Sequence, residues 1–555
     1  MDKNSLERPW LDSYDAHVPA SLDYPNITVN ALLERAIKTH ATKPFIKYED
    51  HIFTYAQIGE FVDRVKYFLT DRGLKKGDRV ALVLPNIPQF VIAYYGILAA
   101  GGIVVAMNPR YTRDEYKRLM EQAKVDYVFC LDGYEEIFQD LISVFDLKAI
   151  IITAMDDLSS PELQKKRDVN DSKQRIWLMD ILYADTEIPH DATPLVLPHD
   201  DAIFQFSGGT IGYPKPAIGT HQNIVANAIQ FSRWCDLVAG EEKVLAAIPL
   251  YHVYGMVLAL NMGVAVGAEV VLISDPTQIE NILKKIEENE ITFYPGVPTM
   301  YHAINQNPLA KKRAFDLTSI KACISGSFTL HPQIKADFEE ITDGKLIEGY
   351  GLSEAPTATH CNPLYGENKV GSIGLPLPDV EAKIVDLESG EVTLDAGEIG
   401  ELVIRGPQVM RGYFEQEEET KNTLRDGWLF TGDIAKIDED GYFFLVDRKK
   451  SLIKVNGLQV WPNEVENVVS SHPSIRACGV GGIPDQEQGE RVVCWVVLEE
   501  GAELDEEGIR NWCKQKISSY KVPREFLVVE SLPRTGVGKI LRRELISSYK
   551  KNAGL

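Results

Sequence analysis

The sequence predicts an α/β protein, with a large N-terminal body of layered α/β subdomains that includes a small β-subdomain, and a small α+β C-terminal domain. β-rich apolar runs alternate with amphipathic helical stretches up to about residue 350, which is typical of α/β layers. After residue 365 the pattern changes to short alternating strands with Gly and Pro turns, which indicates the β-subdomain. From about residue 449 onward, helical and apolar runs indicate one compact α+β unit.

The first elements form a predicted βαβ unit. We expect a buried strand at 80–85, a helix at 86–100 and a parallel strand at 103–107, because the apolar runs are continuous and uncharged. Residues 155–200 are polar and rich in Asp and Pro, so we expect a surface excursion there. Further strands are expected at 126–130, 148–153, 201–206, 268–273 and 320–325, and a helix is expected at 279–290.

The later elements follow the same reasoning. The segments 371–386 and 397–414 are predicted to build the β-subdomain. In the C-terminal unit, helices are expected at 463–472 and 505–520, and strands at 477–483, 491–500 and 525–531.

Length and charge limit the kinds of function. At roughly 100–200 residues per domain, 555 residues predict three or four compact units. The chain carries 58 Lys and Arg against 81 Asp and Glu, a net charge of −23, which repels a phosphate backbone and argues against nucleic-acid partners. Ordinary hydrophobic content, 45%, is far from the composition of a disordered chain.

Compartment is indicated by the cysteines and the N-terminus. Seven cysteines form no C-x-x-C pair and no zinc-like cluster, which favours a reducing compartment. The first residues are polar and acidic, unlike a signal peptide, so a cytoplasmic protein is expected. The 18-residue apolar stretch at 90–107 is split by Gly101-Gly102, and the region 244–268 is broken by Pro249 and glycines. We therefore expect no transmembrane segment.

A glycine-rich loop follows the expected strand at 201–206. It runs Ser207-Gly208-Gly209-Thr210-Ile211-Gly212-Tyr213-Pro214-Lys215. Small residues let backbone N–H groups converge on an anion, hydroxyls add donors and the lysine adds charge, which suits phosphate. The loop fits neither the Walker nor the Rossmann pattern. By itself it could also be a purely structural turn.

The loop and six later segments together resemble the adenylate-forming superfamily of acyl-CoA synthetases, adenylation domains and luciferases. The segments, in order, are PLYHVYG (249–255), EGYGLSE (348–354), GELVIRGP (400–407), FTGD (430–433), VDRKKSLIKVNG (446–457) and GKILRREL (538–545). The opening RPWLDSYDAHVPASLDYP and the phrase VWPNEVE are most similar to bacterial medium- and long-chain fatty-acyl-CoA synthetases. The resemblance covers almost the whole chain.

The resemblance implies an ATP- and Mg²⁺-dependent ligase with coenzyme A as co-substrate. A fatty acid would react with ATP to give acyl-AMP and pyrophosphate, and coenzyme A would then displace AMP. It also implies two domains, an ATP- and acyl-binding body at 1–448 and a mobile cap at 449–555 that turns about a hinge at Lys450.

The family's functional residues match named positions here. Lys539 matches the catalytic lysine, Glu354 the magnesium-holding glutamate, and His252 a residue that lines the acyl site. Thr210 is the expected hydroxyl partner of Glu354 at the metal, and Lys454 and Gly457 lie in the segment that serves thioester formation. The nucleotide contacts implied are Ser207, Gly208, Gly209, Thr210, Gly212, Lys215, Ser325, Gly326, Gly349, Tyr350, Gly351, Ser353, Asp433 and Arg448. Outside their motifs, such residues would be read as caps, turns, salt bridges or core.

Four positions depart from the family pattern. Ile211 replaces a second threonine, Pro216 replaces a glycine, Ser451 replaces an aspartate, and Phe328 replaces a small residue. These departures keep two alternatives open: a nucleotide- or acyl-binding homologue with weakened or lost ligase activity, and an aryl- or short-chain acid ligase. Peripheral membrane contact and a homodimer also stay open.

Overall fold

The structure is a computed structural model, and it describes residues 8–159, 174–185, 195–207, 214–456, 458–485, 488–534 and 540–553. The chain packs as two units. The first takes its described residues from 1–208, 214–381 and 405–427, and the second from 382–404 and 428–555. The sequence predicts a domain boundary after residue 448 because the cap, 449–555, is expected to rotate about Lys450. That boundary stays a prediction.

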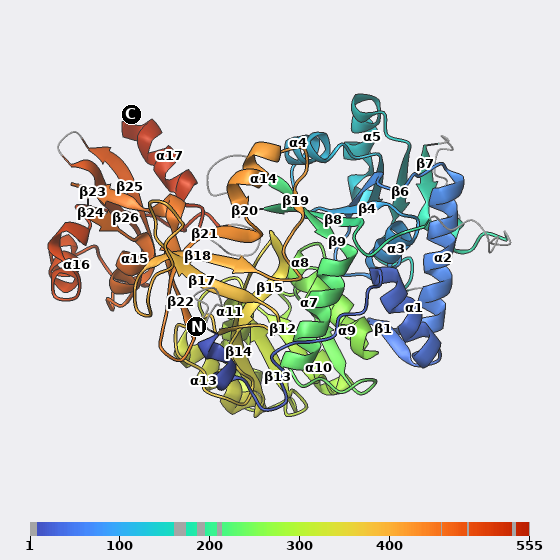
Figure 1. Ribbon diagram of the computed structural model, residues 1–555, viewed down its shortest axis with the longest axis horizontal. Coiled ribbons are helices and arrows are strands. Elements are labelled where there is room, and N and C mark those ends of the chain that lie inside the picture. Colours follow the sequence, from blue (N-terminus) through green and yellow to red (C-terminus); the bar gives the residue numbers. More distant parts are fainter. Residues whose placement is uncertain are drawn as a thin grey trace, which may run out of the picture. The chain divides into compact units, whose positions relative to one another are not determined.

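The first unit contains two large sheets, and one of them leads to the glycine-rich loop (Figure 1). Its strands, in spatial order, are β19 (Gly412–Tyr413), β9 (Lys215–Thr220), β8 (Asp201–Ser207), β4 (Ile103–Ala106), β3 (Arg79–Val83), β5 (Tyr127–Leu131), β6 (Ala149–Thr153) and β7 (Arg175–Trp177). The strands from β8 to β7 pair in parallel, and β9 and β19 are antiparallel additions.

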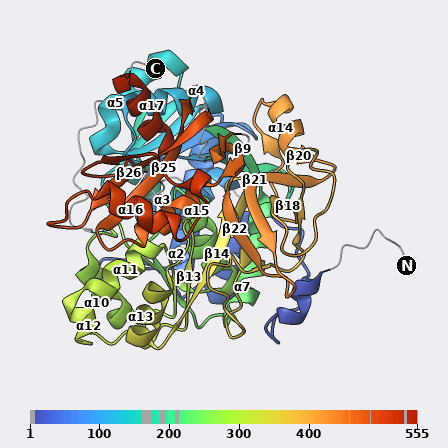
Figure 2. The same cartoon turned by 90° about the vertical axis from the view of Figure 1, so that its left-hand side faces the viewer.

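The second sheet leads to the EGYGLSE segment. Its strands are β16 (Leu375–Pro376), β15 (Ala355–Cys361), β14 (Lys345–Leu352), β13 (Ala322–Ser325), β12 (Phe293–Gly296), β10 (Lys243–Ala246), β11 (Glu269–Leu272), β1 (Pro44–Tyr48) and β2 (His51–Thr54). Apolar side chains of α10 (Ile279–Asn289), α11 (Pro298–Gln306) and α13 (Pro332–Thr342) share one buried core with these strands. Figure 2 shows these helices gathered beside β13 and β14.

The predicted βαβ unit is confirmed. Helix α3 (Pro88–Ala99) joins the parallel strands β3 and β4, and its residues from Pro88 to Leu98 are all buried. A helix that is apolar on every side needs cover on every side, and α2 (Tyr55–Asp71) covers it so closely that a Cβ on Gly96 would lie 2.5 Å from Val65. This packing accounts for the 18-residue apolar stretch. Among the described residues, no helix combines the length and hydrophobicity needed to cross a membrane.

Further helices surround the sheets of the first unit. They are α1 (Val29–His40), α4 (Arg113–Ala123), α5 (Glu135–Phe145), α6 (Leu178–Leu182), α7 (His221–Trp234), α8 (Val253–Gly255), the π-helical turn η4 (Met256–Asn261), α9 (Met262–Val266), α12 (Pro308–Lys311) and α14 (Glu417–Thr423).

Two expectations for this unit are wrong in part. Residues 155–200 were expected to form a surface excursion, but β7 extends the sheet beside β6 and α6 buries Leu178 and Leu182. Strand β7 has three residues and helix α6 has five, which is too few to show hydrophobic periodicity in the sequence. The end of the predicted β-subdomain, β19, instead joins the first large sheet through β9.

The second unit contains two smaller sheets. The strands β17 (Glu381–Val385), β18 (Gly400–Arg405), β21 (Trp428–Ile437) and β22 (Phe443–Arg448) form the predicted β-subdomain, in which β21 pairs antiparallel with both β18 and β22. The other sheet contains β24 (Leu458–Val460), β23 (Ile453–Val455), β26 (Gly489–Leu498), β25 (Ile475–Asp485) and β27 (Glu525–Val528).

Helices cover both faces of this last sheet. Alternate residues of β26 point to opposite faces, so Val492 and Cys494 pack with α15 (Pro462–Ser470) and α16 (Glu506–Lys514). Val493 and Trp495 pack with α17 (Arg542–Ala553) on the other face. Figure 1 shows α17 alongside β25. The α/β class, with a small α+β C-terminal part, is therefore confirmed. Helix α16 ends six residues earlier than the predicted 520, after Lys514.

Candidate functional site

The glycine-rich loop lies between two paired strands of the first unit. Ser207 ends β8 and Lys215 begins β9, and the two residues are antiparallel partners. The predicted loop residues Gly208, Gly209, Thr210 and Gly212, together with Ile211, lie outside the described residues. The departure Pro216 pairs with Phe206, and its carbonyl accepts a 3.0 Å hydrogen bond from the Phe414 amide. The strand therefore continues through the proline.

The Lys215 ammonium contacts two side chains among the described residues. Its ammonium forms an ion pair with Glu419 on α14 and lies 5.6 Å from the centre of the Tyr413 ring. An ammonium at that distance over an aromatic face is attracted by the ring. The loop lysine is thus already held beside a carboxylate and an aromatic ring.

The EGYGLSE segment forms the end of β14 and the turn to β15. Gly349, Tyr350 and Gly351 pair with β15, with irregular register on both sides of Gly351. A Cβ on Gly351 would lie 1.8 Å from the Thr357 carbonyl oxygen, so this close approach requires glycine. Tyr350 is 8% exposed and meets the ring of its strand partner His360 edge-on at 5.9 Å. Ser353 lies in the turn that follows.

Glu354, the predicted metal ligand, is half-buried in the same turn. Its carboxylate Oε1 accepts a 2.8 Å hydrogen bond from the Tyr413 hydroxyl, and its backbone carbonyl accepts one of 2.8 Å from the Met410 amide. Burial, reinforced by the Glu354 charge, raises the pKa of Tyr413 well above its usual range, so the phenol is protonated and donates.

Asn227 on α7 is a supporting residue that the sequence reasoning missed. Its Oδ1 accepts hydrogen bonds from the amides of Thr357 at 2.8 Å and Ala358 at 3.2 Å, and its Nδ2 donates to the Ala358 carbonyl at 2.8 Å. Asn227 therefore fixes the strand that follows Glu354. A signal was present, because Asn223, Asn227 and Gln230 follow helical spacing on a buried face of α7.

His252 begins a tightly packed turn beside the loop strand. Its Nδ1 accepts from the Tyr254 amide at 3.2 Å, which caps α8. The next amide, of Val253, donates to Oε1 of Gln205 on β8 at 3.2 Å. A Cβ on Gly255 would lie 2.3 Å from the Pro249 carbonyl oxygen. The predicted acyl-site histidine is thus tied to the strand that carries Ser207.

Tyr254 connects this turn to Ser325 and Gly326. Its hydroxyl lies 2.7 Å from the Ile324 carbonyl and 2.9 Å from the Gly296 carbonyl, at the ends of β13 and β12. A Cβ on Gly326 would lie 3.0 Å from the Tyr254 ring. The buried Ser325 Oγ has no hydrogen-bond partner within the described residues.

The first unit therefore brings together described residues of three predicted motifs, the glycine-rich loop, PLYHVYG and EGYGLSE, and the predicted contacts Ser325 and Gly326. Ser207 and Lys215 are strand partners, β13 with Ser325 pairs with β14, and Tyr413 joins Lys215 to Glu354. Glu354 fits a metal in its chemistry, because Mg²⁺ prefers carboxylate oxygens and the Glu354 Oε2 has no hydrogen-bond partner among the described residues.

In the second unit, the two predicted ribose contacts form a pair. Asp433 on β21 and Arg448 on β22 are antiparallel partners, and Arg448 Nε lies 2.7 Å from Asp433 Oδ1. The Asp433 side chain is 4% exposed and the Arg448 side chain is 37% exposed. The buried carboxylate is therefore paired with a guanidinium that reaches the surface. Glu401 accepts from the Gly432 amide at 3.1 Å and pairs with Lys449 at 2.7 Å.

The predicted residues beyond Arg448 are only partly described. Lys454 lies on β23, and its amide donates to Glu490 Oε2 at 2.8 Å. Ser451 lies in a short helical turn, Lys449–Ser451. The Lys450 side chain, Gly457 and Lys539 lie outside the described part of the chain.

The start of α17, three residues after Lys539, is anchored to α15. Arg542 Nη2 lies 2.6 Å from Glu466 Oε2 and 2.5 Å from Asn463 Oδ1. The Asn463 amide donates to Asp447 Oδ2 at 2.7 Å. Burial raises the pKa of Asp447 to about 6. The sequence reasoning missed this anchor, although Arg542 lies inside a quoted motif.

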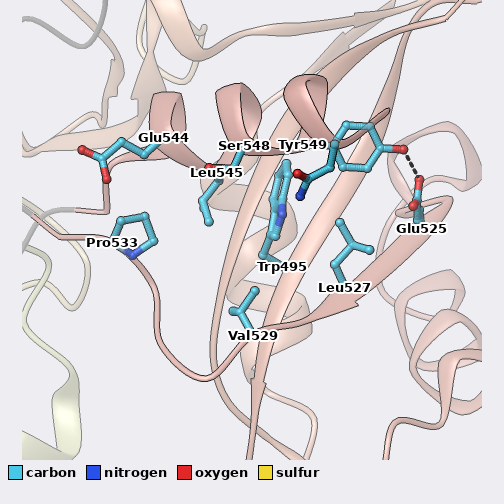
Figure 3. A pocket seen from close by; sticks show the side chains of 10 residues that line it. Trp495, Glu525, Leu527, Val529, Pro533, Glu544, Leu545, Ser548 and Tyr549 are labelled. Atoms are coloured by element: carbon cyan, nitrogen blue, oxygen red, sulfur yellow. Dashed lines mark hydrogen bonds between the residues drawn. The ribbon is translucent and has the colours of Figure 1, made fainter. Parts of the chain in front are cut away.

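A cavity of about 610 Å³ also opens on the second unit, between β26, β27 and α17 (Figure 3). Trp495, Leu527 and Leu545 provide apolar walls, and the Tyr549 hydroxyl donates to Glu525 at 2.8 Å. None of its lining residues is a predicted site residue.

Comparisons with known proteins identify the family. The model of the "AMP-binding enzyme" family matches residues 33–414, and that of the "AMP-binding enzyme C-terminal domain" matches 464–539. The chain belongs to the AMP-binding enzyme family, which confirms the resemblance to adenylate-forming enzymes.

Curated relatives and solved structures agree with this assignment. A long-chain-fatty-acid–CoA ligase of Bacillus subtilis (strain 168) is 40% identical, with 98% of this chain and 99% of the relative covered. A long-chain-fatty-acid–CoA ligase of Salmonella typhimurium is 34% identical, with 97% and 98% covered. The fold is similar to that of ATP-bound MatB from Rhodopseudomonas palustris, with a TM-score of 0.84, 27% identity, and 94% of this chain and 99% of that chain covered.

Proposed function

We propose that the protein is an AMP-forming fatty-acyl-CoA synthetase that acts on medium- to long-chain acids. The observation that carries the proposal is the likeness to long-chain-fatty-acid–CoA ligases over essentially the whole chain, with the described motif residues at connected positions. The alternatives, a homologue without ligase activity and an aryl- or short-chain acid ligase, are not favoured by these relatives.

The reaction has two balanced steps. A carboxylate oxygen of the acid attacks the α-phosphorus of ATP, and the bond to the leaving pyrophosphate breaks. The sulfur of coenzyme A then attacks the acyl carbon, the bond to AMP breaks, and the thiol proton is released. Both steps gather negative charge, which fixed cations and hydrogen-bond donors stabilise.

We assign phosphate binding to Ser207 and Lys215 of the first unit and to the glycine-rich loop between them in the sequence, including Thr210. Glu354, with Thr210, would hold Mg²⁺, which supplies positive charge against the ATP phosphates when bound. The Tyr350 ring would stack on adenine between Gly349 and Gly351, whose missing side chains allow close approach. His252 would line the acyl site; the remaining assigned contacts are Gly208, Gly209, Gly212, Ser325, Gly326 and Ser353.

In the second unit, Asp433 would accept hydrogen bonds from the ribose hydroxyls, oriented by its 2.7 Å contact with Arg448. Lys539 would bridge the carboxylate and the α-phosphate in the first step. Turning of the cap, 449–555, about Lys450 would withdraw Lys539 and bring Lys454 and Gly457 to the adenylate. This is a hinge mechanism.

The setting proposed is the cytoplasm, where ATP and coenzyme A are available. All seven cysteines are buried and free of disulfides in the described chain, which suits a reducing compartment. A homodimer and a peripheral contact with membranes, the source of fatty acids, belong to the same proposal.

The test is thioester formation with acids from acetate to stearate and with aromatic acids. We expect the highest kcat/KM with medium or long chains; a preference for aromatic or short acids would contradict the proposed substrate class. Lys539→Ala should lose adenylation and keep thioester formation from supplied acyl-AMP. The matched control is Lys551→Ala, an exposed lysine on α17. Equal loss of both steps in Lys539→Ala would contradict the hinge.

A further inference from the structure

Tyr413 lies between two residues assigned to phosphate and metal binding, although no motif used above assigns it a role. Its hydroxyl donates to Glu354 Oε1 at 2.8 Å, and the Lys215 ammonium lies 5.6 Å from its ring centre. Tyr413 is 9% exposed. One buried side chain thus contacts both the assigned metal ligand and the loop lysine.

The backbone around Tyr413 is fixed by the strand that leaves the glycine-rich loop. Tyr413 pairs with Ala217 on β9, and the neighbouring Arg411 amide donates to the Ile218 carbonyl at 3.0 Å. The Tyr413 amide donates to Thr420 Oγ1 on α14 at 2.9 Å. These bonds fix the backbone that carries the ring, and burial of the side chain together with its hydrogen bond to Glu354 holds the hydroxyl in place.

The same short segment holds Glu354 at two points. The Met410 amide donates to the Glu354 carbonyl at 2.8 Å, and the Tyr413 hydroxyl donates to its carboxylate. A hydrogen bond to an ionised carboxylate is strong and directional. With Oε1 occupied by the phenol, the carboxylate is oriented so that Oε2 is left for a cation.

We propose that Tyr413 is a positioning residue that orients the Glu354 carboxylate for Mg²⁺ and places Lys215 beside the ATP phosphates. The proposal rests on the function proposed above, in which Glu354 holds the metal. It adds a residue that acts through Glu354 and Lys215 without touching the reacting atoms. Glu419 completes the arrangement because it pairs with Lys215 from α14.

The experiment is a double-mutant cycle read by MgATP binding. Wild type, Tyr413→Phe, Glu354→Ala and the double variant are titrated with MgATP by isothermal calorimetry, and thermal unfolding is recorded for each. Tyr413→Phe keeps the ring under Lys215 and removes only the hydroxyl. The matched control is Tyr55→Phe, which removes another buried hydroxyl, bonded to the Ala268 carbonyl at 2.7 Å.

We expect Tyr413→Phe to weaken MgATP binding by about tenfold, the size of a lost hydrogen bond to a charged group. In the Glu354→Ala background the same change should have less than a roughly twofold effect, because the group through which it acts is absent. Tyr55→Phe should bind MgATP like wild type. Raising Mg²⁺ at constant ATP should restore much of the Tyr413→Phe loss.

Three results would overturn the proposal: unchanged MgATP affinity in Tyr413→Phe, an equal loss in both backgrounds, or unfolding of Tyr413→Phe at a much lower temperature than Tyr55→Phe. The last would mean that the hydroxyl supports the fold. A wild type that binds MgATP without making acyl-AMP would overturn the proposed function, yet the binding cycle would still decide the role of Tyr413. A wild type that does not bind MgATP would overturn both.

Discussion

Gly351→Ala should destabilise the protein far more than Gly349→Ala, although both glycines lie in one motif. A Cβ at Gly351 would lie 1.8 Å from the Thr357 carbonyl oxygen and 2.7 Å from the Ala358 Cα. These are backbone atoms, and hydrogen bonds from Asn227 to the backbone of Thr357 and Ala358 hold that segment in place. Overpacking of a site that cannot yield costs about 1–3 kcal/mol, sometimes more, so we expect a loss of about 3 kcal/mol.

At Gly349 the nearest atom is a methyl carbon of Ile324, 3.3 Å from the added Cβ. A side chain can shift by a few tenths of an ångström, so we expect a loss below about 1 kcal/mol. The assay is the free energy of unfolding from urea titration. Stability is the primary readout because both glycines are assigned nucleotide contacts. Equal stability of the two variants would refute the argument that the close approach of β14 and β15 requires glycine.

Three further predictions concern other residues of the motifs. Burial raises the pKa of Glu348 to about 8, so the folded protein keeps a proton that the unfolded chain releases near pH 4.5, and stability falls as pH rises between these values. Relative to Glu348→Gln, wild type should lose about 3 kcal/mol of unfolding free energy between pH 5.5 and 8.5, at 1.36 kcal/mol per pH unit. Parallel pH profiles of unfolding for the two proteins would contradict this. Arg542→Ala removes the ion-pair partner of Glu466 and should cost about 3 kcal/mol, whereas Lys551→Ala, at an exposed position of the same helix, should change little. Equal melting temperatures would show that the α15–α17 anchor is unimportant. Ile211→Thr should lower the KM for ATP by about tenfold if a hydroxyl there reaches phosphate, and unchanged KM and kcat would show that the loop compensates.

Periodicity and the positions of Gly and Pro predicted most of the fold. In the uncharged run at 80–107, Gly101-Gly102 favoured a covered β-α-β unit over a membrane span, and β3, α3 and β4 form that unit. The short β7 and β19 were not predictable in this way. Their places depend on which distant strand edge is open, β6 for one and β9 for the other.

The candidate site, like the fold, could be predicted only in part. Motifs located Glu354, Lys215, Asp433 and Arg448, and the structure joins the last two directly. Asn227 and Tyr413 were missed because each acts across a long sequence separation, Asn227 on residues 357–358 and Tyr413 on Glu354. The helical spacing of Asn223, Asn227 and Gln230 is a local signal of a polar face, but local pattern does not show which distant residues such side chains contact. Lys539 and the loop residues 208–213 lie outside the described chain, so their roles stay predictions.

The central claim is that the protein activates a fatty acid through acyl-AMP. Exchange of labelled pyrophosphate into ATP measures that step without coenzyme A. We predict exchange that depends on an added medium- or long-chain fatty acid and on Mg²⁺, and that is lost in Lys539→Ala. An absence of exchange with every acid in a broad panel, from a folded protein that binds MgATP, would contradict the account.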